Sequence, residues 1–290
     1  ALLALALAAV ARALHPVPVD FQSTTFTVSD GARLHVLEAG QVRPGQPAVA
    51  FVPGWSMPAS IWTGQMAALA SSHRVVALDP RGQGESAIAP DGYTTERRAE
   101  DLREFVERNA PVVLVTWSLG SLEALQYLRT HGDASVAALV IVDSSVGEGP
   151  APPPRAAGVP GLQDELRRDR AGTVDAFVRA MFRTPRPEAE ISALREAALR
   201  MPLEASLSLF PGERIPREHW REAVHRYGKP LLYVVTPQFA AQAESLRQNR
   251  PATQVEVFES AGHALFLDEP ERFANLLSSF VARNKQMRAR

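Results

Sequence analysis

The chain has 290 residues, of which 46% are hydrophobic and 22% charged, which is typical of a globular protein with one large domain or a domain with an insert. Its formal net charge of −1 gives no general attraction to nucleic acid, so we expect no nucleic-acid partner. The sequence contains no cysteine, which excludes disulfides, thiolate metal sites and a cysteine nucleophile.

Residues 1–20 form an N-terminal apolar segment that is distinct from the rest. The stretch ALLALALAAVARA at residues 1–13 resembles the apolar core of a secretory signal, with a small-x-small site at Ala11-Arg12-Ala13. It is too short to span a bilayer as a helix. Two interpretations stay open: a signal remnant of an exported protein, or an N-terminal helix of a cytoplasmic one. Membrane contact is expected only through this segment.

Strands and helices then alternate along the chain. The sequence predicts strands where short apolar or alternating runs occur, at residues 24–28, 33–38, 48–52, 74–78, 112–115, 136–142, 230–235 and 254–258. Helical spacing predicts helices at residues 61–71, 95–108, 119–128, 240–247 and 270–283. This alternation predicts a mostly parallel sheet with helices on both faces, an α/β architecture.

Residues 147–226 interrupt that rhythm. The segment begins with a proline-rich stretch at residues 149–154 and continues with helical patterns at 174–182 and 188–200, separated by further prolines. We interpret it as a helical cap inserted into a core made of residues 21–146 and 227–290. We expect this cap to cover the active site.

A candidate nucleophile lies where the strand at 112–115 meets the helix that begins near Leu119. Ser118 sits in Thr116-Trp117-Ser118-Leu119-Gly120, a strand-to-helix turn with the form of a nucleophile elbow, except that Thr116 replaces the usual first glycine. In parallel sheets ligands bind at the carboxyl ends of the strands. Trp55, Asp79 and Asp143 also follow strands, so they converge with Ser118 at one edge.

Four sequence blocks, in this order, resemble the α/β-hydrolase superfamily, in particular its capped, cofactor-free serine esterases and perhydrolase-like members. They are Phe51-Val52-Pro53-Gly54-Trp55, Asp79-Pro80-Arg81-Gly82-Gln83-Gly84-Glu85-Ser86, the elbow, and Ala261-Gly262-His263 followed by Glu269-Pro270-Glu271-Arg272-Phe273. The resemblance covers nearly everything after residue 24. It implies an α/β-hydrolase fold and a hydrolase that needs neither a metal nor an organic cofactor.

A serine hydroxyl needs an adjacent base to act as a nucleophile at neutral pH. His263 is the histidine in a glycine-flanked loop after a late strand, and we expect it to be that base. His73, His131, His219 and His225 are expected on the surface, and His35 is expected to be a strand residue without chemistry.

The resemblance implies an oxyanion hole made of the backbone N–H groups of Trp55 and Leu119. It also implies that Asp79 and Arg81 have a structural role in their turn. Trp117, Met181 and Phe182 are expected to line the substrate pocket.

The third member of the triad departs from the family pattern. The usual acid follows the strand that ends at Val235, but no carboxylate occurs there until Glu244. The alternative family position follows the strand after the elbow helix, which here ends at Asp143. We therefore predict Asp143 as the triad acid, the other interpretation being an aspartate that caps a turn. Asp268 is expected to cap the closing helix.

These residues predict a serine hydrolase that cleaves a small-molecule carboxylic ester through an acyl-enzyme on Ser118. Lactonase or perhydrolase chemistry with the same triad is an alternative. The second class is a non-catalytic relative that binds a small ligand. Thr116, Pro53 in place of the usual histidine before Gly54, and the missing late acid keep that class open.

Overall fold

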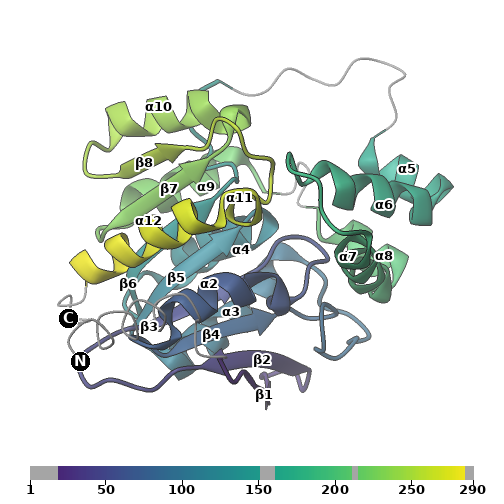
Figure 1. Cartoon of the computed structure of the whole chain (residues 1–290), viewed down its shortest axis with the longest axis horizontal. Coiled ribbons are helices and arrows are strands. Elements are labelled where there is room, and N and C mark those ends of the chain that lie inside the picture. The colour runs from purple at the N-terminus through teal and green to yellow at the C-terminus, as the bar shows by residue number, and fades with distance from the viewer. Residues whose placement is uncertain (1–18, 151–160, 211–214, 285–290) are drawn as a thin grey trace, which may run out of the picture.

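The computed structural model describes residues 19–150, 161–210 and 215–284 (Figure 1). The N-terminal stretch at residues 1–13 lies outside these ranges, so both interpretations of it stay predictions, together with the localisation that depends on them. None of the described helices has the length and apolar character needed to cross a membrane.

A single eight-stranded sheet forms the centre of the described molecule. Its strands are β1 (Gln22–Thr27), β2 (Arg33–Ala39), β3 (Ala48–Val52), β4 (Val75–Asp79), β5 (Val112–Trp117), β6 (Val136–Val142), β7 (Leu231–Val235) and β8 (Gln254–Val257). They are ordered β1-β2-β4-β3-β5-β6-β7-β8. The pairings β1–β2 and β2–β4 are antiparallel, and β3 to β8 run parallel.

Helices cover both faces of this sheet, as the sequence predicts. They are η1 (Ala59–Trp62), α2 (Thr63–Ala70), α3 (Thr95–Asn109), α4 (Leu119–His131), α5 (Leu162–Arg168), α6 (Arg170–Ala180), α7 (Glu188–Arg200), α8 (Leu203–Ser208), α9 (Arg217–Arg226), η3 (Pro237–Phe239), α10 (Ala240–Asn249), α11 (Leu265–Asp268) and α12 (Pro270–Arg283).

Alternate residues of the central strands supply two separate hydrophobic cores. Val113 and Val115 of β5 face the core that contains α2 and α12, whereas Val112 and Leu114 face the core of α3, α4, α9 and α10. Every residue of β5 and of β6 is buried, because a parallel sheet with helices on both sides leaves no wet face. Ser118 and Asp143, which follow β5 and β6, are therefore attached to two fully buried strands.

Helices α5 to α8 gather as a separate layer at one end of the sheet (Figure 1). Their apolar residues, among them Val178 and Leu207, join the same core as β3 and β5. Helix α9 differs, because its Ala223 and Val224 lie in the other core and the helix packs against α4. Of the helices in the segment predicted as a cap, 147–226, α5 to α8 therefore form this layer, which we call the cap, whereas α9 packs with the core.

Candidate active site

Ser118 occupies the sharp turn between β5 and α4. Its φ of 54° and ψ of −123° place a non-glycine residue in a strained backbone conformation, which is what a nucleophile elbow requires. A side chain at Gly120 would put a Cβ 2.5 Å from the carbonyl oxygen of Pro53. The second glycine of the elbow is therefore needed for close approach of two backbones.

Thr116 fits the position of the usual first glycine because its side chain is used in hydrogen bonds. Thr116 Oγ1 donates to the carbonyl of Val140 at 3.1 Å and lies 2.9 Å from Ser121 Oγ. Both residues are fully buried. The hydroxyl is thus satisfied beneath the turn, and the branched residue does not block the elbow.

Three side chains from separate parts of the sheet edge are hydrogen-bonded in series. Ser118 Oγ lies 2.9 Å from Nε2 of His263, and His263 Nδ1 lies 2.7 Å from Oδ2 of Asp143. The other oxygen of Asp143 accepts a 2.7 Å hydrogen bond from the Thr236 N–H. Glu244, the alternative acid, lies on α10 and bonds to Arg247 and Gln248 instead.

The His263 loop is fixed by contacts to the cap and to β5. Asp268 accepts hydrogen bonds from the N–H of Gly262 at 2.7 Å, from Arg183 N–H at 2.8 Å, and from Thr184. Although burial opposes ionisation, these bonds from Thr184 and the backbone hold the pKa of Asp268 below its usual range. The expectation that Asp268 caps the closing helix is wrong, because the carboxylate joins loop and cap.

Two backbone N–H groups beside Ser118 have no hydrogen-bond partner within the described residues: those of Trp55 and Leu119. Leu119 is the first residue of α4, where an N–H has no partner within the helix. Gly54 is so close to Ser118 that an added Cβ would lie 3.0 Å from the serine Cβ. The two N–H groups predicted for the oxyanion hole therefore have no partner among the described residues, and both belong to residues that line the same cavity as Ser118.

Ser118, His263 and Asp143 open into a cavity of about 390 Å³ with mostly apolar walls. The core contributes Trp55, Leu119, Leu122, Trp220 and Phe239, and the cap contributes Phe177 and Phe210. The Trp55 ring packs against both cap phenylalanines with centroids 5.2 Å apart, and its Nε1 donates to the carbonyl of Ser206. One residue thus joins the proposed oxyanion loop to the cap.

The residues predicted to line the substrate pocket lie elsewhere. Trp117 is buried at the end of β5, where its ring packs against that of His263 with centroids 5.1 Å apart and its Nε1 donates to the His263 carbonyl at 2.9 Å. Met181 is buried in the core, and its carbonyl accepts from Ala264 N–H. Phe182 borders a separate surface hollow with Arg186 over its ring. Phe177, one turn earlier on α6, takes the predicted place.

A second serine–histidine–aspartate series occurs on the antiparallel part of the sheet, and sequence reasoning missed it. Ser23 Oγ lies 2.6 Å from His35 Nε2, and His35 Nδ1 lies 2.7 Å from Asp79 Oδ2. The hydrogen bond to Asp79 raises the pKa of His35 although burial opposes this. No local motif marks this series, because its three residues come together only when β1, β2 and β4 pair.

The remaining histidines and Arg81 differ in their burial. His73, expected on the surface, is only 4% exposed, so that expectation is wrong, whereas His131 and His225 are exposed and pair with Glu100 and Glu148. Arg81 is buried against Asp101 and Asp30. Within the described ranges no cluster of acidic and histidine side chains is arranged to hold a metal ion.

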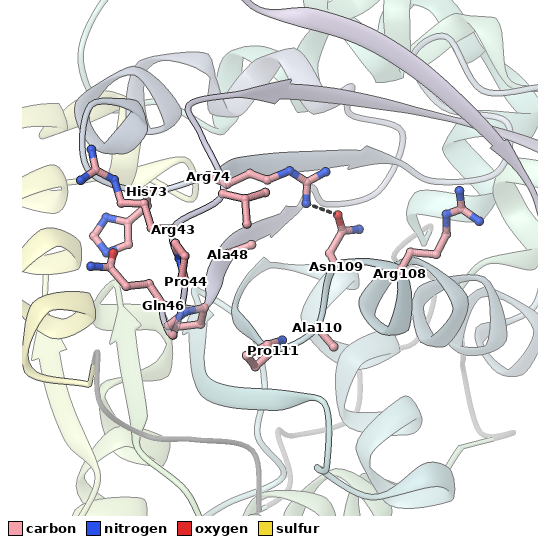
Figure 2. Close-up of a pocket in the computed structure, with 13 residues that line it drawn as sticks. Arg43, Pro44, Gln46, Ala48, His73, Arg74, Arg108, Asn109, Ala110 and Pro111 are labelled. Atoms are coloured by element: carbon pink, nitrogen blue, oxygen red, sulfur yellow. Dashed lines mark hydrogen bonds between the residues drawn. The ribbon is translucent and has the colours of Figure 1, made fainter.

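Another cavity, of about 340 Å³, lies at the opposite edge of the sheet, near the starts of β3, β4 and β5 (Figure 2). Two of its arginines are already paired: Arg74 bonds to Asn109, which also lines the cavity, and to Glu38, and Arg43 donates to the Ser71 carbonyl. Figure 2 shows the Arg108 side chain turned away from the other labelled residues. None of the residues that line this cavity belongs to either serine–histidine–aspartate series.

Comparison with known proteins agrees with this geometry. The sequence model of the Alpha/beta hydrolase family matches residues 49–276. A pimeloyl-[acyl-carrier protein] methyl ester esterase of Aeromonas hydrophila is 26% identical over 249 residues, which cover 81% of this chain and 95% of that protein. A Burkholderia cenocepacia protein assigned as an aryl esterase superposes with a TM-score of 0.77 at 26% identity, covering 91% of this chain and 99% of its own.

A bromoperoxidase from Bacillus anthracis has the same fold, with a TM-score of 0.78 at 18% identity over 90% of this chain and all of that one. A non-heme chloroperoxidase of Kitasatospora aureofaciens is 31% identical over 121 residues, 41% of this chain and 42% of that protein. The family model spans most of the sheet, the elbow and the His263 loop. The chain therefore belongs to the alpha/beta hydrolase family.

Proposed function

We propose that this protein is a serine hydrolase that cleaves carboxylic esters of small molecules through an acyl-enzyme on Ser118. The observation that carries the proposal is the hydrogen-bonded series Ser118–His263–Asp143, which lines an apolar cavity together with Trp55 and Leu119, whose N–H groups have no partner among the described residues. The likeness to two proteins named as esterases supports the same reaction class.

In the first half-reaction, Ser118 Oγ attacks the ester carbonyl carbon while His263 Nε2 accepts the hydroxyl proton. The oxyanion that forms is bound by the Trp55 and Leu119 N–H groups, and Asp143 stabilises the imidazolium through Nδ1. The tetrahedral intermediate then collapses: the bond to the alkoxy oxygen breaks, and the leaving alcohol takes the proton from His263. An acyl group remains on Ser118.

Water completes the second half-reaction. It attacks the acyl carbon and gives a proton to His263, and collapse of the second intermediate returns that proton to Ser118 and releases the carboxylic acid. The aromatic walls of the cavity suit an uncharged, apolar acyl or alcohol group, because they offer few polar partners to a buried charge.

A fluorophosphonate probe tests this proposal against a non-catalytic binding protein. The probe should label the protein in one-to-one ratio, and peptide mass spectrometry should place the label on Ser118. Labelling should be absent in the Ser118→Ala protein, whose melting temperature should match that of the wild type. An unlabelled wild-type protein that still binds esters would favour the non-catalytic class.

Perhydrolysis is a second candidate because one relative, 31% identical over 121 residues, is named as a non-heme chloroperoxidase. The same acyl-enzyme would then be attacked by hydrogen peroxide in place of water, giving a peracid. Adding peroxide to an ester assay distinguishes the two outcomes: a perhydrolase converts most acyl groups to peracid, whereas an esterase continues to release the acid.

A further inference from the structure

Gln83 lies in the turn after β4 and reaches the loop that carries Trp55. Its side-chain Nε2 donates to the carbonyl of Gly54 at 3.0 Å and to the carbonyl of Met57 at 2.7 Å. Gln83 is 1% exposed, so these bonds form away from solvent. The two carbonyls flank the short loop from Trp55 to Ser56, and one side chain therefore holds both of its ends.

The bond to Gly54 bears directly on the Trp55 N–H. The Gly54 carbonyl and the Trp55 N–H belong to one planar trans peptide, so they point in opposite directions. A donor that fixes the direction of the Gly54 carbonyl therefore also fixes the direction of the Trp55 N–H, in the peptide where Gly54 approaches the Ser118 Cβ. A hydrogen bond to the carbonyl further polarises the peptide and strengthens its N–H as a donor.

The loop needs such support because its backbone is strained. Ser56 has a φ of 58°, in the left-handed region that serine rarely adopts, and its buried hydroxyl has no hydrogen-bond partner among the described residues. The bond from the Met57 N–H to the Gly54 carbonyl is long, at 3.3 Å. The Gln83 amide thus adds two hydrogen bonds to a turn whose own backbone hydrogen bond is long.

A buried ion pair fixes the orientation of that amide. Gln83 Oε1 accepts a 3.0 Å hydrogen bond from Arg98 Nη1, and Arg98 pairs with Glu123 on α4 at 3.1 Å. Both charged side chains are at most 2% exposed. Since the guanidinium can only donate, Oε1 must face it, and the amide nitrogen must face the two loop carbonyls.

From these contacts we propose that Gln83 is a positioning residue of the oxyanion hole, held in place by the Arg98–Glu123 pair. The proposal rests on the function proposed above and extends it to a residue that touches neither substrate nor the reacting atoms. Gln83 acts on the transition state through the Trp55 N–H. A correctly oriented N–H stabilises the negative charge that develops on the substrate carbonyl oxygen, and it contributes much less in the substrate complex.

Two substitutions test it. Gln83→Leu removes both donors, and Gln83→Glu keeps the size and the partner of Arg98 but offers no N–H to the carbonyls. Loss of a whole oxyanion donor lowers kcat by about 10²–10³-fold, so misdirecting one should lower kcat/KM by about 10- to 100-fold. KM and the pH profile should change little, because Ser118, His263 and Asp143 keep their hydrogen bonds.

The matched control is Gln65→Leu. Gln65 is also a buried glutamine that donates to a backbone carbonyl, that of Phe266, at 2.7 Å, but it does not touch the loop of Trp55. Gln65→Leu should lower the melting temperature by about as much as Gln83→Leu does, while kcat/KM stays within about threefold of wild type.

The deciding readout is inhibitor affinity. An alkyl trifluoromethyl ketone forms an oxyanion on Ser118, whereas the matching unreactive amide does not. Both Gln83 variants should bind the ketone more weakly by the factor lost in kcat/KM and bind the amide as before. Equal weakening of both ligands, or a loss that only follows melting temperature, would overturn the positioning role. If Ser118→Ala retained full activity, the proposed function itself would fail, whatever the Gln83 variants do.

Discussion

The molecule contains the same three side chains in the same hydrogen-bonded order at two places. In both, a serine oxygen lies beside histidine Nε2, and histidine Nδ1 lies 2.7 Å from an aspartate. One series, Ser118–His263–Asp143, faces an apolar cavity. The other, Ser23–His35–Asp79, spans the antiparallel edge of the sheet. We expect chemistry only at the first, and the difference lies in the surroundings of the shared residues.

Backbone geometry separates the two serines. Ser118 stands at a strained turn with a helix N-terminus behind it, so its oxygen is presented at the tip and an anion nearby is stabilised. Ser23 is an exposed residue in the regular edge strand β1, with no positive φ. Ser118 is placed for nucleophilic attack, whereas Ser23 only provides a hydrogen-bond partner for the buried His35.

The two aspartates also have different duties. Asp143 uses one oxygen for His263 and the other for a single backbone N–H. Asp79 accepts from His35 and from the N–H groups of Ala59 and Glu85, and a Cβ at Gly84 would lie 1.9 Å from it. Asp79 is therefore the centre of a turn, which agrees with a structural role for its series.

The largest expected effect is on the serines. Ser118→Ala should lower kcat for ester hydrolysis by about 10⁶-fold, because nucleophile and base act as a unit. Ser23→Ala, which removes the equivalent atom from the other series, should leave kcat within about twofold. Steady-state kinetics on an activated aryl ester measure both. A large loss in Ser23→Ala with Ser118→Ala still active would reverse the assignment of the two series.

The aspartates should differ next most strongly. Asp143→Asn should lower kcat by about 10⁴-fold, since the amide favours the wrong histidine tautomer and cannot stabilise the imidazolium. Asp79→Asn should instead lower the melting temperature, because an amide donor replaces an acceptor of three bonds, and kcat of the folded protein should stay near wild type.

Glu244→Gln is the control for the position where relatives carry the acid. Its exposed carboxylate contacts only neighbours on α10, so neither kcat nor stability should change measurably. Near-normal activity in Asp143→Asn together with a crippled Glu244→Gln protein would return the acid to the late loop.

A smaller effect concerns the apolar side chains that line the cavity at Ser118. Phe177→Ala enlarges the cavity beside Trp55 and should shift the ratio of kcat/KM for long over short acyl esters by about tenfold. Phe182→Ala, an equally half-buried phenylalanine of the same segment that lies outside the cavity, should leave the ratio unchanged. Equal shifts in both proteins would argue against this account of specificity.

The sequence predicted the strands and helices around the site well, but it did not predict the tertiary contacts that position the site residues. The bounds of β6, α7 and α12 agree with prediction because each is an uninterrupted periodic run, and Asp143 follows from its place at a strand end. Gln83 is 29 residues from Gly54, so their contact depends on tertiary packing that no local pattern encodes. Met181 and Phe182 are predicted from their apolar character alone, but they follow the end of α6, and packing places Phe177 of that helix in the cavity instead.

The smallest effect is a pH dependence of stability, and it tests the structural role of the second series. The hydrogen bond to Asp79 raises the pKa of His35 in the folded state, with burial opposing and Asp79 and Glu85 adding attraction. A raised folded pKa means that folding favours the protonated form. The stabilisation is therefore complete below the ordinary value of 6.5 and is lost as the pH rises through the folded pKa.

His35→Gln removes this dependence of stability on pH. Its melting temperature should lie furthest below that of wild type near pH 6, and the gap should narrow, by a few degrees at most, toward pH 9. Ester hydrolysis by His35→Gln at 25 °C should stay near wild type throughout, because His263 is unchanged. A gap that stays constant with pH would mean that His35 is not protonated in the folded protein, and its bond to Asp79 would then stabilise the turn as a neutral hydrogen bond.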